Sequence, residues 1–81
     1  MYEIQFSSGA TKFLRTLQKD IQGRIKRKFE EIAQNPHRYL EHYEGDYYKI
    51  RIGDFRALVD LDTNTKVLVV QVFDKRARIY E

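Results

Sequence analysis

Residues 47–61, which read YYKIRIGDFRALVDL, decide the fold. Hydrophobic side chains recur at every second position on both sides of the Gly53-Asp54 pair, first over residues 47–52 and then over residues 55–61. A period of two is typical of half-buried strands. A two-residue connection that contains glycine closes a tight hairpin. The stretch therefore predicts two neighbouring antiparallel strands.

Two further strands flank this hairpin in the sequence. Residues 62–65 contain Asp, Thr and Asn, which favour a turn, and residues 66–73 are almost continuously apolar. Such a run suits a central strand that is covered on both faces. Residues 2–6 alternate like the hairpin and predict a first, half-buried strand. Residues 36–46 show no strong periodicity and are expected to form a linker.

Two helices are predicted between the first strand and the linker. Ser7 or Ser8 can cap the first helix, whose apolar side chains follow at helical spacing. A break is expected near Lys19, with Asp20 placed to cap the second helix. Asn35-Pro36 ends it, because proline cannot continue a helix. The sequence thus predicts an α+β fold of order β-α-α-β-β-β, with a helical hairpin packed on one face of an antiparallel sheet.

The composition limits the classes of function. The 81 residues suffice for a single domain, 1–81. The absence of cysteine excludes disulfides and thiolate metal sites and is consistent with a cytoplasmic protein. No apolar run approaches the roughly 18 residues of a membrane span, and no cofactor-binding or metal-binding motif is present. His37 and His42 lie in the linker, where we expect them to be exposed bystanders.

Charge is segregated along the chain, although the net charge is only +3. Residues 12–28 are strongly basic, whereas residues 30–46 are mostly acidic. Segregated charge creates a field that can attract polyanions. A solvated face of an ordinary basic helix would give the same pattern, so both interpretations stay open.

The predicted sheet places cations together. Lys49 and Arg51 are two residues apart and therefore project from one face. A tight turn pairs Arg51 with Arg56, so these side chains should stand side by side on that face. Like charges that oppose each other are destabilising, which makes sense if an anion normally occupies the space. The other interpretation is the exposed face of a sheet covered on one side.

Further groups are positioned to join these cations. Tyr47 shares their face, and others follow the last strand: Lys75, Arg76, Arg78 and Tyr80. Guanidinium groups bind phosphate oxygens in pairs, and aromatic rings stack on unpaired bases, so the set suits RNA. Fixed cations can also stabilise the extra charge of a phosphoryl transition state.

Residues 48–56 (YKIRIGDFR) resemble the signature Y-[KR]-[LI]-R-[VI]-G-[DN]-[YF]-R of the RelE/ParE toxin superfamily. Residues 75–80 (KRARIY) resemble its closing H-R-x-x-[VI]-Y, and the first helix and the Asn35-Pro36 stop match as well. The resemblance spans nearly the whole chain. Departures occur at Val59, Asp74 and Lys75, where the family commonly has an aromatic residue, glycine and histidine.

The resemblance implies a toxin of a type II toxin–antitoxin system. RelE-type members cleave mRNA in the ribosomal A site, without a metal ion or cofactor, by attack of a ribose 2′-OH on the adjacent phosphate. It implies that Arg56 stabilises the scissile phosphate and that Lys49 and Arg51 sit near the 2′-OH, which one of them could help to deprotonate. Arg76 would stabilise charge or protonate the leaving oxygen, and Tyr80 would stack on or orient a base.

The resemblance also implies partners and leaves alternatives. The partners expected are the ribosome, mRNA and a RelB-like antitoxin that is partly disordered, and a heterotetramer with that antitoxin is one assembly it allows. Lys75, Arg78 and Tyr47 are expected to bind RNA. ParE-type members of the superfamily inhibit DNA gyrase instead, which is one alternative. A degenerate module that binds RNA or antitoxin without catalysis is the other.

Overall fold

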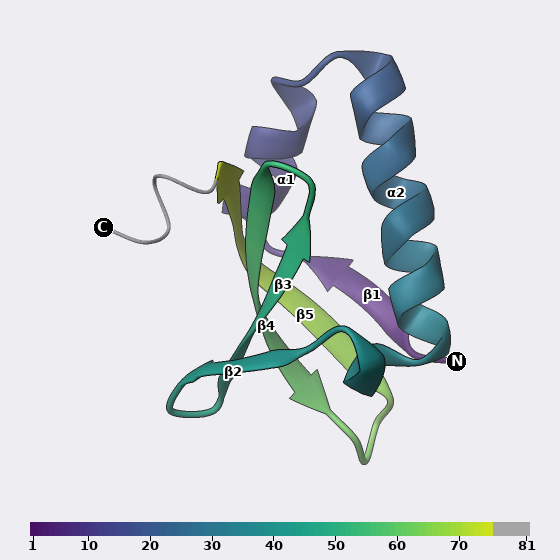
Figure 1. Cartoon of the computed structure of the whole chain (residues 1–81), viewed down its shortest axis with the longest axis vertical. Coiled ribbons are helices and arrows are strands. Elements are labelled where there is room, and N and C mark those ends of the chain that lie inside the picture. Colours follow the sequence, from purple (N-terminus) through teal and green to yellow (C-terminus); the bar gives the residue numbers. More distant parts are fainter. Residues whose placement is uncertain (76–81) are drawn as a thin grey trace.

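The computed structural model describes residues 1–75 of the chain. Its elements are β1 (Glu3–Phe6), α1 (Ser8–Arg15), α2 (Lys19–Gln34), a short 3-10 helix η1 (Pro36–Arg38), β2 (Glu41–Glu44), β3 (Tyr47–Ile52), β4 (Phe55–Asp62) and β5 (Val67–Lys75). The strands form one five-stranded sheet in the order β1-β5-β4-β3-β2 (Figure 1). The α+β class and the helical hairpin are as predicted. No helix in this described part is long and apolar enough to cross a membrane.

The β3–β4 hairpin has the predicted register. Ile52 pairs with Phe55 and Arg51 with Arg56, so only Gly53 and Asp54 connect the strands. Gly53 has a φ of 57°. This left-handed conformation is unfavourable for residues with a Cβ atom, whereas glycine adopts it readily. The glycine therefore fixes the tight turn, and the turn fixes which side chains share a face.

The sheet is mixed, whereas the sequence predicted an antiparallel one. β1 runs parallel to β5, with Glu3 opposite Val67. The chain leaves β1 through both helices and all of the other strands before β5 docks beside it, and a connection of that length permits a parallel pair. Local turns predict the direction of consecutive strands only, so this long-range pairing was not accessible from the sequence.

An additional strand, β2, lies inside the predicted linker. All four of its residues are exposed, and its pairing with β3 shifts register between His42 and Glu44. An edge strand without a buried face has no hydrophobic alternation, and that is why the pattern did not reveal it. In Figure 1 the β2–β3 turn projects at the lower left, away from α2.

The helix boundaries largely follow their local signals. The Ser7 hydroxyl accepts a hydrogen bond from the amide of Ala10 at 3.1 Å and caps α1. The prediction that Asp20 caps α2 is wrong: Gln18 holds that position without a side-chain bond, and Asp20 lies in the first turn. A carboxylate there still interacts favourably with the positive end of the helix dipole. α2 ends at Gln34, directly before the Asn35-Pro36 stop.

The core lies between the helical hairpin and one face of the sheet. Its fully buried centre comprises Ile25, Ile32, Ile50, Val59, Leu68 and Val70. The Phe73 ring packs edge-on against Phe13 and Phe29, with centroids 5.7 and 5.9 Å away. The opposite side, here called the open face, is not covered by the helices. The expectation that the last strand is covered on both faces is therefore wrong, since Val72 of β5 is 42% exposed.

Candidate active site

The open face of β3 and β4 carries the cations that the sequence singled out. Lys49 and Arg51 alternate with the buried Ile50, and Arg56 lies directly opposite Arg51. Lys49 pairs with Leu58 of β4 on one side and with Glu41 of β2 on the other. The register therefore brings the three cations together on one face, as predicted.

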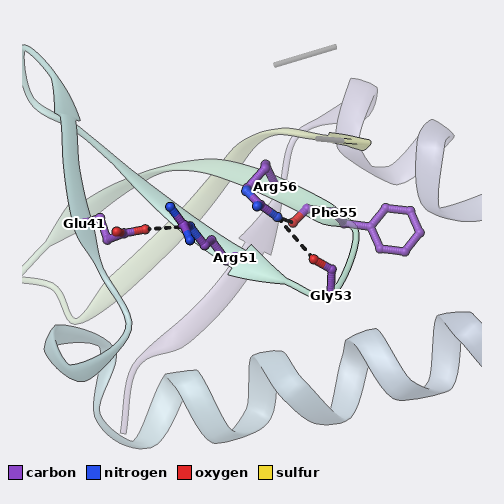
Figure 2. Close-up of polar contacts among 5 residues, drawn as sticks. All are labelled: Glu41, Arg51, Gly53, Phe55 and Arg56. Atoms are coloured by element: carbon purple, nitrogen blue, oxygen red, sulfur yellow. Dashed lines mark hydrogen bonds and ion pairs between the residues drawn. The ribbon is translucent and has the colours of Figure 1, made fainter. Parts of the chain in front are cut away.

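Arg51 has a carboxylate partner that the sequence analysis missed. Its Nε lies 3.2 Å from Oε2 of Glu41, and the two side chains are 58% and 49% exposed (Figure 2). β2 supplies this carboxylate, so the contact could not be foreseen while residues 36–46 were taken for a linker. Glu41 also lies opposite Lys49 in the register, so its negative charge partly offsets the positive charge of both side chains.

Arg56 is buried, with 3% of its surface exposed. Its Nη1 donates hydrogen bonds to the carbonyl oxygens of Gly53 at 3.2 Å and Phe55 at 2.9 Å, which closes the side chain over the turn (Figure 2). Asp74 of β5 lies opposite Arg56 in the register, so this departure from the family pattern places a carboxylate on the cationic face.

The two opposed arginines share a register position, but their guanidinium groups turn apart. Figure 2 shows that of Arg51 directed toward Glu41 and that of Arg56 directed toward the turn. Two like charges that find separate partners repel each other less than two that face each other. The repulsion therefore does not by itself require a bound anion, in contrast to the expectation from the sequence.

Of the remaining predicted residues, the structure describes Tyr47 and Lys75, which lie on opposite faces of the sheet. Tyr47 is 43% exposed and, with Tyr43, Leu58 and Asp60, lines an open hollow of about 490 Å³. Lys75 is the last residue of β5 and pairs with Phe55, which places its Cα on the helix side of the sheet rather than beside Arg56. Arg76, Arg78 and Tyr80 lie outside the described residues.

The polar contacts of His42 and Asp62 are made away from Lys49, Arg51 and Arg56. His37 and His42 are exposed, as expected, and Nε2 of His42 lies 3.1 Å from the Gly45 carbonyl oxygen. The pKa of Asp62 is lowered because Thr65 and Asn64 donate hydrogen bonds to its carboxylate, but this group belongs to the β4–β5 turn. Within residues 1–75, no group of three or more His, Asp or Glu side chains could hold a metal ion.

The family is decided by comparison with known sequences. A family model described as "ParE toxin of type II toxin-antitoxin system, parDE" matches residues 4–80. A candidate toxin of Methanocaldococcus jannaschii, RelE4, is 36% identical over 87 aligned residues, which cover 100% of this chain and 93% of that protein. The chain belongs to the RelE/ParE toxin superfamily.

Solved structures of RelE toxins have the same fold as this superfamily member. The toxin–antitoxin complex RelBE2 of Mycobacterium tuberculosis contains a chain that matches with a TM-score of 0.82 and 22% identity, over 93% of this chain and 98% of that one. The isolated RelE toxin of E. coli matches with a TM-score of 0.75 and 23% identity, over 99% and 92%. At these identities the likeness shows the fold alone. Structural relatives, including the mycobacterial one, have been crystallised with a RelB antitoxin.

Proposed function

We propose that this toxin is a ribosome-dependent endoribonuclease of the RelE type. It cleaves mRNA in the ribosomal A site, without a metal ion, by attack of a ribose 2′-OH on the adjacent phosphate. The observation that carries the proposal is the cationic open face, on which Lys49, Arg51 and Arg56 meet in register. The candidate RelE toxin among its relatives supports the same branch of the superfamily.

The exposures of the cations suggest different roles. Arg51 is 58% exposed, so its guanidinium can reach a phosphate oxygen of the substrate and bind it with paired hydrogen bonds. Arg56 is almost fully buried and acts from beneath, because a charge with little water around it exerts a stronger field on a bound phosphate. Arg76 and Tyr80 complete the proposed set. Arg76 stabilises the negative charge that develops on the leaving oxygen, and Tyr80 stacks on a base of the mRNA.

The partner proposed is an acidic, partly disordered antitoxin that folds as it binds. Structural relatives crystallised with RelB support this, and the basic balance of the chain suits an acidic partner. The antitoxin would cover or displace the cationic open face, and a heterotetramer would hold two copies of each protein. Because the substrate is mRNA on the ribosome, the site of action is the cytoplasm.

The test is controlled expression of the wild type and a Lys49→Ala/Arg51→Ala variant, followed by primer extension on a translated reporter mRNA. Both side chains lie on the open face and neither is fully buried, so the variant should fold. Lys12→Ala/Arg15→Ala is the matched control, since it removes the same charge from exposed positions of α1. We expect cuts within translated codons for the wild type and the control, and their loss in the open-face variant.

Other outcomes would select the alternatives. Growth arrest with intact mRNA would indicate that the target is gyrase or another molecule. This alternative is retained because the matching family model is described as a ParE toxin. Intact mRNA with normal growth would indicate a degenerate module that binds RNA or antitoxin without cutting. Cuts that persist in the open-face variant would refute the proposed site while leaving the activity.

A further inference from the structure

The proposed cleavage requires a group that takes the proton of the ribose 2′-OH, and the cations of the open face serve poorly. An arginine side chain keeps its proton in proteins and offers only donors, and a lysine must first lose a proton before it can accept one. An ionised carboxylate is an acceptor from the start. The position of a carboxylate among these cations therefore matters for the chemistry.

Glu41 is such a carboxylate. It lies opposite Lys49 in the register, its Oε2 is 3.2 Å from Nε of Arg51, and its side chain is 49% exposed, so substrate can reach it. Figure 2 shows it at the end of the row formed with Arg51 and Arg56, on the same face. A base beside a guanidinium that binds phosphate is well placed, because the 2′-OH and the scissile phosphate are neighbours in the same nucleotide.

We propose that Glu41 is the general base of the cleavage, an inference that rests on the proposed function. Its carboxylate takes the 2′-OH proton as the 2′ oxygen forms a bond to phosphorus, and the bond from phosphorus to the 5′ oxygen breaks. The leaving 5′ oxygen takes a proton from solvent. The products are a 2′,3′-cyclic phosphate and a 5′-hydroxyl end, and Glu41 then returns its proton to water. Arg51, whose Nε lies beside the Glu41 carboxylate, binds the phosphate through its other N–H groups.

The charged and ionisable groups around Glu41 come from three strands. Lys49 and Arg51 face it from β3, and Arg56 of β4 lies one strand further. On β2 itself the ionisable neighbours are His42, Tyr43 and Glu44. A carboxylate at this position can accept the 2′-OH proton, whereas an amide in its place cannot take over that role.

The experiment measures single-turnover cleavage on mRNA-programmed ribosomes at neutral pH, with the purified full chain. We expect Glu41→Gln to slow cleavage by roughly 10²–10⁴-fold, the usual contribution of a general base. Glu41→Asp, which keeps a carboxylate, should cleave faster than Glu41→Gln and more slowly than the wild type. Co-sedimentation with ribosomes should be unchanged in both variants. Glu44→Gln, on the same exposed strand, is the matched control and should cleave like the wild type.

Each failure has its own signature. A wild type that cuts no mRNA refutes the proposed function and this inference together. A wild type that cuts while Glu41→Gln stays within about threefold of it, or while Glu41→Asp is as slow as Glu41→Gln, refutes the role of Glu41 alone. A slow Glu41→Gln variant that no longer binds ribosomes also overturns the inference, because the carboxylate would then serve binding rather than proton transfer.

Discussion

Replacing Arg56 with alanine is expected to destabilise the protein by about 2–4 kcal/mol. Its Nη1 donates to two carbonyl oxygens of the β3–β4 turn, at 2.9 and 3.2 Å, and the residue is 3% exposed. A hydrogen bond from a charged group contributes about 1.5–3 kcal/mol, and the longer of the two bonds shares its donor nitrogen with the shorter. For a domain of this size each kcal/mol shifts Tm by about 4–8 °C, so a fall of roughly 8–32 °C follows.

The matched control is Arg51→Ala. It removes the same charge from the directly opposite position and the same repulsion between the two strands. Its exposed ion pair with Glu41 is worth only about 0–1 kcal/mol. Thermal and urea denaturation followed by circular dichroism would measure both variants. Equal losses of stability, or a loss below about 1 kcal/mol for Arg56→Ala, would refute the account of Arg56 as a buried clamp of the turn. If the account holds, loss of activity in Arg56→Ala cannot be attributed to chemistry alone.

Three further predictions concern stability. The pKa of Asp62 is lowered in the folded state by hydrogen bonds that Thr65 and Asn64 donate. The ionised carboxylate therefore stabilises the fold at any pH above the ordinary pKa of aspartate. This stabilisation is lost as the pH falls through the lowered pKa of the folded state. The gap in Tm between wild type and Asp62→Asn should therefore shrink below about pH 4, and a constant gap would contradict this. Phe73→Ala should cost about 3–5 kcal/mol in urea denaturation, because the buried ring contacts other phenylalanines of the core. A loss of stability below about 1 kcal/mol would show that the Phe73 ring is not tightly packed. Gly53→Ala should cost about 1–2 kcal/mol for its positive φ, whereas Gly9→Ala, in helical α1 with open space around a Cβ, should add up to about 1 kcal/mol. Losses of stability in both glycine variants would show that backbone conformation is not the cause.

The parts of the fold that were predictable from the sequence are those fixed by neighbours in the chain. The β3–β4 hairpin follows from alternation around Gly53-Asp54, α1 begins directly after its Ser7 cap, and α2 ends directly before Asn35-Pro36. β2 could not be predicted, because a fully exposed edge strand leaves no periodic trace. The parallel pairing of β1 with β5 also escaped prediction, because it joins the two ends of the described chain.

The candidate site was predicted in part for the same reason. Lys49 and Arg51 share a face by a period of two, and one tight turn places Arg56 opposite Arg51, so local rules suffice for all three. Lys75 was assigned to the same site, yet the register pairs it with Phe55 and puts its Cα on the other side of the sheet. One residue more or less in the last strand decides the face, and the end of a strand is poorly marked in sequence.

The sequence by itself determined the order of the elements other than η1 and β2, the cationic face and the likeness to RelE/ParE toxins, since each depends on spacing along the chain. Only the tertiary structure decided what surrounds the cations. It brought Glu41 from an unrecognised strand to Arg51 and set Asp74 opposite Arg56. It also buried Arg56 against the turn. Charge on a residue is a property of its type, but its partners and its access to water depend on strands that meet through long-range register, and these govern its chemistry.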